Sequence, residues 1–396
     1  MLKGGIVYRI LNFYIYKQCK FMILDNIKNR YPKLPYILFS LMILVFISKS
    51  YAFYIFEVNM GTSIPNEINF ILVWGFRICL GLLILFTTWN LDNIFFIAIG
   101  FLVTILYRES SLLAFVVLGV YCKDNKISTN YIVKTYLYIT AVFFLGSILL
   151  NTFKIIPNSA NVHFRNNSIR NDFGLGNPNA PFLAALPMYA GYIYLRFDKY
   201  DNIDRVLLIL ISLLIYSQTF SRTGLITIFT ILIFVELIKR VDITKNKYAR
   251  FVLSYLPILI TVFSFLTAKL LNFKFFNKLL SERPRLWDIY TGHIKLFRNV
   301  DYFSLRENYP LDNSYIFSFV LYGIIFTILL LFIYTYFMKQ NVIKNNSKVL
   351  AISSLFLIYS YGENILLRTY LNFTFILVII TICSNFSIKN IKFNKK

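Results

Sequence analysis

Long apolar runs are the feature that most constrains how this chain folds. Of its 396 residues, 58% are hydrophobic and 18% are aromatic, above the roughly 45–50% apolar content of soluble domains. A run that crosses about 30 Å of hydrocarbon must satisfy all its backbone polar groups internally, and a helix does so. The sequence therefore predicts an all-α, polytopic membrane protein whose single domain spans residues 1–396.

The apolar runs indicate about twelve transmembrane helices, although several runs are shorter than the ~20 residues of an upright crossing. They lie at 36–56, 70–89, 93–107, 110–122, 135–150, 178–195, 206–219, 224–238, 251–271, 314–337, 349–361 and 370–386. Before the first run, Arg9, Lys17 and Lys20 interrupt apolar sequence, a pattern typical of a helix on a membrane surface. Residues 1–35 are therefore predicted to be a cytoplasmic, interfacial segment.

The basic residues set the expected orientation. The chain has 41 Lys+Arg against 18 Asp+Glu, and a formal net charge of +23. With the N-terminus inside, roughly 25 of the basic residues fall on the cytoplasmic side, in line with the positive-inside rule. Both termini are therefore predicted to be cytoplasmic. Because membrane anchoring accounts for this charge, no nucleic-acid partner is expected.

The sequence indicates neither a cofactor nor a metal. The four cysteines, Cys19, Cys79, Cys122 and Cys383, have no paired spacing, which argues against a zinc site or a disulfide framework. The sequence also lacks a P-loop, a Rossmann glycine fingerprint and a His-Glu-x-x-His pair. Use of ATP, of a dinucleotide or of catalytic zinc is therefore not expected.

The outer basic residues gather in two long segments, 151–177 and 272–313, and long loops often carry function. The first segment contains Arg165 and Arg170 and leads into Asn177-Pro178-Asn179, where a helix is expected to begin. Free amides at a helix N-terminus bind anions, although Asn177 is also well placed simply to cap the helix. We therefore assign Arg165, Arg170, Asn177 and Asn179 to substrate binding.

The second segment supplies further candidates. It contains Arg283-Pro284-Arg285-Leu286-Trp287, then His293, then Leu311-Asp312-Asn313-Ser314-Tyr315. Arginine binds phosphate oxygens bidentately, and tryptophan offers a flat face to a sugar ring, so Arg285, Trp287 and Asn313 are assigned to substrate binding. Asp312 ranks ahead of His293 as the candidate catalytic base. The alternative for Asp312 is stabilisation of a helix start.

Arg222 is the most unusual residue of the set. It stands in Ser221-Arg222-Thr223-Gly224, between two apolar runs with almost no loop around it. A cation at such a depth is costly unless it meets an anion or water. Together with Arg285 and the two arginines of the first segment, Arg222 predicts a pocket for a lipid-borne phosphate.

Other charges near membrane level are assigned to pairing within the bundle. Glu363 and Arg368 share a short outward turn and are expected to pair with each other. Arg77 and the neighbours Arg108 and Glu109 are expected to find partners inside the bundle.

The ordered motifs resemble a known family. Arg170 with Phe173-Gly174 and Asn177-Pro178-Asn179 comes first, followed by Ser221-Arg222-Thr223-Gly224, Arg285-Leu286-Trp287, Leu311-Asp312-Asn313-Ser314-Tyr315 and Tyr322-Gly323. This set is similar to the bacterial oligosaccharide repeat-unit polymerases of the Wzy type, within the O-antigen polymerase and ligase superfamily. The spacing of Arg165 and Gly176 also fits an Arg-x10-Gly pattern found in some members, while the second segment lacks a counterpart.

The resemblance implies a GT-C-like, metal-independent membrane glycosyltransferase. Such an enzyme joins capsular or O-antigen repeat units carried on undecaprenyl pyrophosphate, at the outer face of the bacterial cytoplasmic membrane. Its outward arginines would hold the pyrophosphate of the lipid-linked oligosaccharide. A flippase and a chain-length regulator of the same pathway are the implied protein partners.

Three alternatives stay open at the level of the sequence. An O-antigen ligase performs the same chemistry on a different acceptor. A polysaccharide flippase or other transporter also has about twelve helices, but such folds are often built from repeated halves, and the sequence has no internal repeat. A non-enzymatic scaffold for envelope assembly is a third reading.

Overall fold

The computed structural model is almost entirely helical in the part of the chain that it describes. It describes residues 27, 29–107, 110–158, 164–165, 168–243, 245–270, 280, 282–298, 311–368 and 370–386, with the backbone alone at 164–165 and 168–169. The described residues also contain a short antiparallel hairpin with two residues in each strand, β1 (Phe164–Arg165) and β2 (Ser168–Ile169). The predicted all-α class is confirmed, apart from this hairpin.

From Leu34 on, the described residues of the first half of the chain form six α-helices and one π-helical segment. These are α2 (Leu34–Ala52), η1 (Phe53–Asn59), α3 (Asn66–Leu85), α4 (Leu91–Tyr107), α5 (Ser110–Asp124), α6 (Thr129–Thr152) and α7 (Ala180–Arg196). The second half continues with η2 (Phe197–Lys199), α8 (Asn202–Thr219), α9 (Arg222–Arg240), α10 (Lys247–Lys269), α12 (Arg283–Thr291), α14 (Ser314–Leu321), α15 (Gly323–Ile343), α16 (Ser347–Gly362) and α17 (Thr374–Asn385).

Six of these helices are long and apolar enough to cross a membrane, which makes this a multi-pass membrane protein. They are α2 with η1, α3, α6, α8, α10 and α15. Their outward side chains are large and hydrophobic, such as Ile71, Val142 and Phe332, as lipid contact requires. Two shorter apolar helices, α4 and α17, add to them.

Each predicted apolar run contains a helix, but the tenth run contains two. The run at 314–337 breaks between α14 and α15, where Gly323 has a φ of +87°. A Cβ at Gly323 would lie 2.6 Å from the backbone of Phe297, so glycine is required for the segment before α14 to approach this closely. The short helix α12, inside the predicted loop 272–313, was not predicted.

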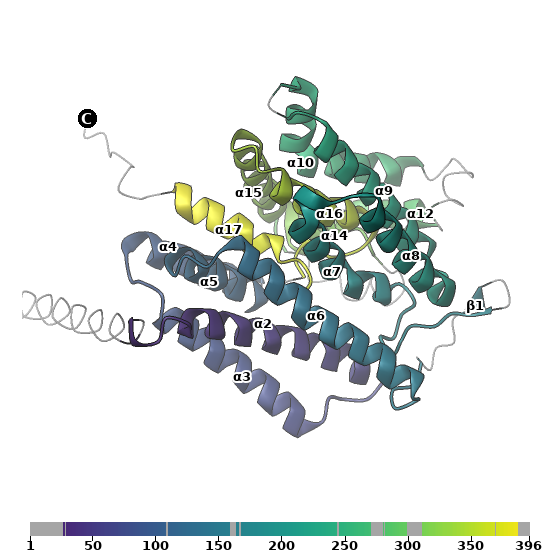
Figure 1. Ribbon diagram of the computed structural model, residues 1–396, viewed down its shortest axis with the longest axis horizontal. Coiled ribbons are helices and arrows are strands. Elements are labelled where there is room, and N and C mark those ends of the chain that lie inside the picture. The colour runs from purple at the N-terminus through teal and green to yellow at the C-terminus, as the bar shows by residue number, and fades with distance from the viewer. Residues whose placement is uncertain are drawn as a thin grey trace, which may run out of the picture.

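The helices form one bundle with a continuous core. Figure 1 shows α2, α3, α4, α5 and α6 together in one part of the molecule and the later helices in the other, with α17 between them. Helix α17 packs on α5 and α15, and α6 packs on α7, so the two parts are joined. Fully buried Phe115, Ile376 and Leu355, from both parts, belong to the same hydrophobic cluster.

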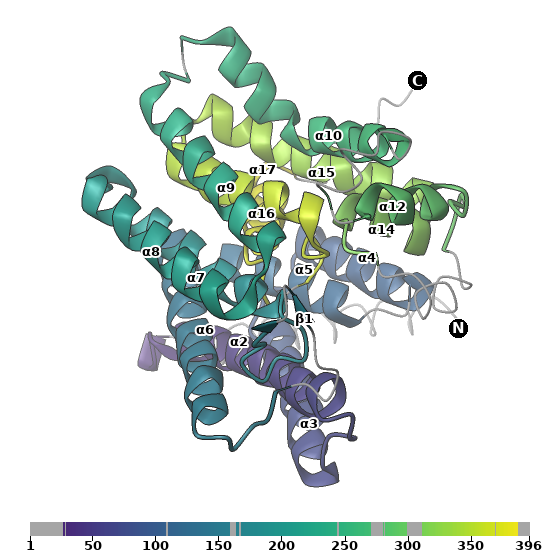
Figure 2. The same cartoon turned by 90° about the vertical axis from the view of Figure 1, so that its right-hand side faces the viewer.

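Polar contacts define two opposite ends of the bundle. At the end called here the loop face, contacts join the stretches 170–179, 219–224, 264–269, 283–288, 312–314 and 361–368. At the basic face, contacts join 196–205, 236–240 and 348. Hairpin β1–β2 and α12 lie toward the right in Figure 1 and toward the viewer in Figure 2.

Candidate functional site

A cavity of about 300 Å³ opens at the loop face between α9, α10, α12 and α16. Helices α9 and α10 are consecutive, yet both pack on α16 and make little contact with each other. The walls of this first cavity are Arg222, Thr223, Ile226, Thr227, Thr230, Ile260, Phe263, Leu280, Arg283, Trp287, Ile358, Tyr361 and Gly362. Two arginines therefore stand in a pocket that is otherwise mainly apolar.

The turn between α8 and α9 positions the first of these arginines. Helix α8 ends at Thr219, and its C-cap residue Phe220 is left-handed, with φ 47°. Ser221 then caps α9 by accepting from the amide of Gly224 at 3.4 Å. A Cβ at Gly224 would lie 2.4 Å from the ring of Phe182. The start of α9 is thus seated directly on α7, and Arg222 follows at the cavity wall.

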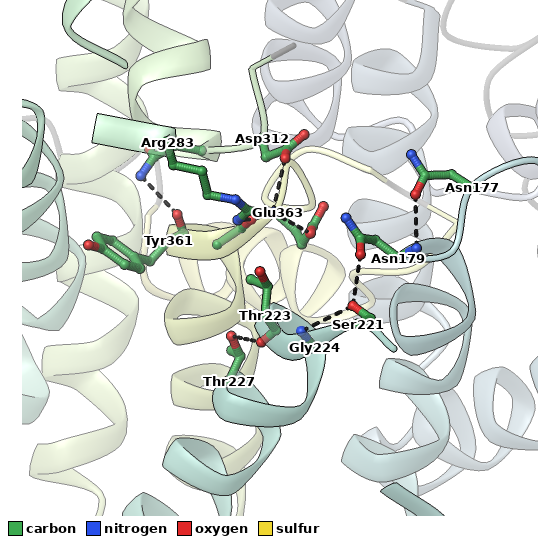
Figure 3. A network of polar contacts seen from close by, with 12 residues as sticks. Asn177, Asn179, Ser221, Thr223, Gly224, Thr227, Arg283, Asp312, Tyr361 and Glu363 are labelled. Atoms are coloured by element: carbon green, nitrogen blue, oxygen red, sulfur yellow. Dashed lines mark hydrogen bonds and ion pairs between the residues drawn. The ribbon is translucent and has the colours of Figure 1, made fainter. Parts of the chain in front are cut away.

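The residues predicted around the first outward segment support this turn. The guanidinium of Arg170 donates to the backbone oxygen of Thr219 at 2.8 Å and to Oδ1 of Asn179 at 3.2 Å. The same Oδ1 accepts from Ser221 at 2.8 Å (Figure 3). Burial lowers the pKa of Arg170. Arg170 and Asn179 therefore hold the turn that carries Arg222, and neither lines the first cavity.

Helix α7 begins two residues later than predicted. Its first residue is Ala180, and the proline of its first turn is Pro181, not Pro178. Asn177 accepts from the amide of Asn179 at 2.8 Å (Figure 3), so it orders the residues just before the helix. Its predicted role as the cap of this helix is wrong, because the N-cap position belongs to Asn179, whose side chain makes no capping bond.

Arg222 is the cation of the first cavity without a local counter-charge. Its side chain is exposed, and within the part of the chain that the structure describes no carboxylate lies within ion-pairing distance of it. It stands at the first residue of a 19-residue helix, where free amides add partial positive charge. An anion entering the cavity would meet both.

Arg283, which was not among the residues predicted from the sequence, differs from Arg222 in both burial and pairing. It is buried, and its Nη2 lies 3.0 Å from Asp312 and 3.1 Å from Glu363 (Figure 3). Its Nη1 donates to the backbone oxygen of Gly362. Arg283 thereby ties α12 to the start of α14 and the end of α16.

The pKa values of Glu363 and Arg283 both depart from their ordinary values at this site. Burial, reinforced by the negative charge of Asp312, raises the pKa of Glu363 from 4.5 to about 7, although Arg283 opposes this. Burial alone would lower the pKa of Arg283, but Glu363 and Asp312 raise it above its ordinary value. Arg283 therefore keeps its charge, while Glu363 changes charge near neutral pH.

The expected pairing of Glu363 with Arg368 is wrong. Glu363 pairs with Arg283, because that guanidinium reaches the buried end of α16. Arg368 donates instead to the hydroxyl groups of Tyr54, at 2.7 Å, and Tyr370, at 3.4 Å. The sequence alone could not predict this, because Arg283 is 80 positions from Glu363 and Arg368 only five, and the pairing depends on how the helices pack.

Among the other predicted substrate-binding residues, Trp287 lines the first cavity. Its ring is buried and meets Tyr361 edge to face, with centroids 5.2 Å apart. Asn313 lies outside the cavity walls and is wholly buried. It caps α14 through the amides of Tyr315 and Ile316 and donates to Ser264 and to the backbone oxygen of Tyr361. Its polar atoms are thus occupied by the protein itself.

The remaining predicted residues do not line the first cavity. Asp312 reaches it only through Arg283, and its side chain is 36% exposed. Arg285 on α12 and His293 just after it are exposed. The side chain of Arg165, like Arg108 and Glu109, lies outside the described residues. Arg222 and Trp287 are therefore the predicted residues that the structure brings together.

Comparison with known proteins identifies no relative from which the role of the site could be inferred. No family model, no curated protein and no solved structure matches the chain. Among the described residues, no group of three or more His, Cys, Asp or Glu side chains is placed to hold a metal ion. The chemistry that the site can perform follows from its arginines, its carboxylates and its apolar walls.

Proposed function

We propose that this protein is a membrane glycosyltransferase that polymerises oligosaccharide repeat units carried on undecaprenyl pyrophosphate. The product would be a capsular or O-antigen polysaccharide, made at the outer face of the bacterial cytoplasmic membrane. In this proposal about twelve helices cross the membrane as a GT-C-like bundle, both termini are cytoplasmic, and the loop face points outward. A flippase would supply the substrate, and a chain-length regulator would limit the product.

The observation that carries the proposal is the contrast between the two arginines of the first cavity. Arg283 already has two carboxylates, at 3.0 and 3.1 Å. Arg222 is exposed beside it at the start of α9, without such a partner among the described residues. A guanidinium is well suited to grip phosphate oxygens bidentately. A pyrophosphate is thus the ligand that supplies the missing charge.

The apolar walls fit the lipid part of that ligand. Ile226 and Thr230 on α9 face Ile260 and Phe263 on α10 across the cavity. Ile226 and Phe263 are each 55% exposed, and α9 and α10 make little mutual contact. An isoprenoid chain can therefore lie between them while its head group stays at the loop face, since burying apolar surface is favourable.

The chemistry would be a transfer from one lipid to another. A hydroxyl group of the acceptor attacks the anomeric carbon of the donor sugar, and the bond from that carbon to pyrophosphate breaks. Negative charge grows on the leaving pyrophosphate, so a fixed cation there lowers the barrier. Arg222 takes this role, Trp287 contacts a sugar, and Asp312, the carboxylate open to solvent, accepts the proton.

Deletion and complementation test the proposal in cells. A strain lacking the gene should accumulate single repeat units on undecaprenyl pyrophosphate at the outer face and lose long polymer. Complementation with the wild-type gene or with Arg240→Gln, a change on the basic face, should restore polymer, while Arg222→Gln should not. Retention of long polymer without the gene would refute polymerisation. Polymer no longer transferred to its final acceptor would identify a ligase, and units trapped inside would identify a flippase.

A further inference from the structure

A second cavity, of about 500 Å³, lies at the loop face on the other side of the Gly362–Asn364 segment. Its walls come from α2 and η1, from α3, α5 and α14, and from the connection between α16 and α17. It contains two cations, Lys49 and Arg368, together with the hydroxyl groups of Tyr54 and Tyr370. The first cavity shares none of these residues.

Arg368 is held in this cavity by neutral groups. Its Nη1 donates to Tyr54 at 2.7 Å and to Tyr370 at 3.4 Å, and the two hydroxyl groups are 2.9 Å apart. No carboxylate among the described residues pairs with it. Phenol groups orient a guanidinium but do not neutralise it, and the three N–H groups on Nε and Nη2 take no part in these two bonds. Its positive charge is therefore held in place without an ion pair among the described residues, and Glu363 acts on it only at a distance.

Lys49 adds a second positive charge to the same cavity. It is exposed in the last turn of α2, and its ammonium group lies 5.5 Å from the centre of the Phe76 ring. The described part of the chain offers it no carboxylate partner. Two like charges that face one cavity repel each other. An anion that binds both removes that cost.

The backbone that presents Tyr54 is itself unusual. Tyr54 belongs to η1, a seven-residue π-helix continuing α2. Segments of π-helix are rare and occur frequently at functional sites. Here the π-helix turns the hydroxyl group of Tyr54 toward Arg368 and Tyr370, far away in sequence. Among the described elements, none around the first cavity is a π-helix.

The two cavities share a thin wall. Gly362 lines the first and Asn364 lines the second. The Cα atoms of two residues separated by one other are at most about 7 Å apart. Between them stands Glu363, bound to Arg283 and therefore linked to Asp312. Ligands held by Arg222 and by Arg368 would meet at this wall.

We infer that the second cavity binds the pyrophosphate head group of a second lipid-linked unit, held by Arg368 and Lys49, while the first cavity holds the donor. This inference rests on the proposed function. The acceptor hydroxyl forms a bond to the anomeric carbon of the donor sugar, and its proton passes to Asp312. The bond from that carbon to pyrophosphate oxygen breaks, and its electrons stay on the released undecaprenyl pyrophosphate.

Native mass spectrometry of the purified full-length chain with undecaprenyl pyrophosphate tests this inference. The wild type should bind two lipids, and Arg222→Gln and Arg368→Gln should each bind one. Because the half-buried Arg368 contacts Tyr54 and Tyr370 and its loss can affect folding, Lys49→Gln provides a second variant on an exposed side chain. It should weaken the second binding event about tenfold, the order expected for one charged contact.

Arg77→Gln is the matched control for Lys49→Gln. Arg77 is also an exposed cation in a membrane helix and also stacks on a ring, with 5.1 Å from its guanidinium carbon to the Trp74 centroid. It lines neither cavity, so its loss should leave both binding events unchanged. Equal weakening by the two variants would overturn the inference.

The outcomes separate this inference from the proposed function. A single bound lipid that is lost in Arg222→Gln and kept in Arg368→Gln overturns the second site and leaves the polymerase proposal standing. Absence of any bound lipid overturns both. An excess of phosphatidylglycerol that displaces the second lipid would identify a general anionic-lipid site and overturn the inference, whereas retention against phosphatidylglycerol supports it.

Discussion

The basic face and the loop face both carry cations, but they treat them differently. At the basic face, Arg205 lies 2.6 Å and Arg240 3.2 Å from the carboxylate of Glu236, and Arg196 lies 3.2 Å from Asp204. At the loop face, Arg222 and Arg368 have no carboxylate partner among the described residues. The three arginines of the basic face are thus paired with carboxylates of the protein itself. The two arginines of the loop face are open to an anion from outside, which is the basis of the proposed lipid binding.

Arg283 is the exception that makes the contrast useful. It lies at the loop face and lines the first cavity, yet it has two carboxylates. Because its charge is already paired, we assign Arg283 a structural role. Arg222, which has no such pair, is assigned to ligand binding. Replacing these two arginines should therefore have different consequences, one for stability and the other for activity.

The largest expected effect follows from Arg283→Met. The change leaves Glu363 buried without its cation, which costs about 3–5 kcal/mol for a broken buried pair. We expect a large fall in the midpoint of thermal denaturation in detergent, with part of it recovered when Glu363→Gln is added. A midpoint equal to that of the wild type would show that this arginine is not the structural one.

Arg222→Gln should have the next largest effect, on rate instead of stability. Loss of one fixed donor to a developing negative charge costs about 10²–10³ in rate. Arg222→Lys keeps the charge but loses the bidentate fork, so its rate should lie between that of the wild type and that of Arg222→Gln. Polymerisation measured with lipid-linked units checks both. Near-normal rates for Arg222→Lys would exclude a forked contact with phosphate.

The protonation of Glu363 should give a smaller, pH-dependent effect. Because its pKa rises on folding from 4.5 to about 7, its contribution to stability is present below the unfolded value and lost as the pH rises through 7. From pH 5 to pH 8 the free energy of unfolding should fall by an amount on the order of 1–3 kcal/mol. The midpoint of thermal denaturation, which is measured, should fall with it.

The matched variant for this effect is Glu363→Gln, which still accepts from Arg283 without titrating. The groups facing Glu363 are Asp312 before α14, Arg283 on α12, Tyr359 on α16, and Arg368 in the connection between α16 and α17. The pH-dependent fall should be smaller in Glu363→Gln. An identical fall in both proteins would assign it to other groups.

The smallest effect is expected for Arg285→Gln. The sequence singled out this arginine, but its side chain is exposed on α12 and does not line the first cavity. A surface change of this kind alters stability by no more than about 0.5 kcal/mol, and the rate should fall far less than in Arg222→Gln. A loss of rate as large as that of Arg222→Gln would restore Arg285 to the binding site.

Apolar runs predicted the helices well because helix formation in such a run depends on local sequence and on burial. The break at Gly323 was missed, since it depends on the backbone of Phe297 approaching from another segment. Helix α12 was missed because it is short and its sequence is mixed in polarity. The number of crossings stays a prediction beyond the six long helices.

The candidate site was predicted in part. Arg222 stood out because its neighbours on both sides are apolar, a local signal. The sequence could not show that Arg283, and not Arg285, lines the first cavity, because the two lie in the same motif and only the partners at Asp312 and Glu363 distinguish them. The one available hint was Glu363 itself, because an acid in a short turn between apolar helices requires a cation.

Reconstitution tests the central claim most directly. Purified protein in lipid nanodiscs would be given single repeat units on undecaprenyl pyrophosphate, and both polymer length and released undecaprenyl pyrophosphate would be measured. The account predicts a ladder of products with matching lipid release for the wild type and for Arg240→Gln, and initial rates of both about 10²–10³ lower for Arg222→Gln. A full ladder from Arg222→Gln, or none from the wild type, would contradict it.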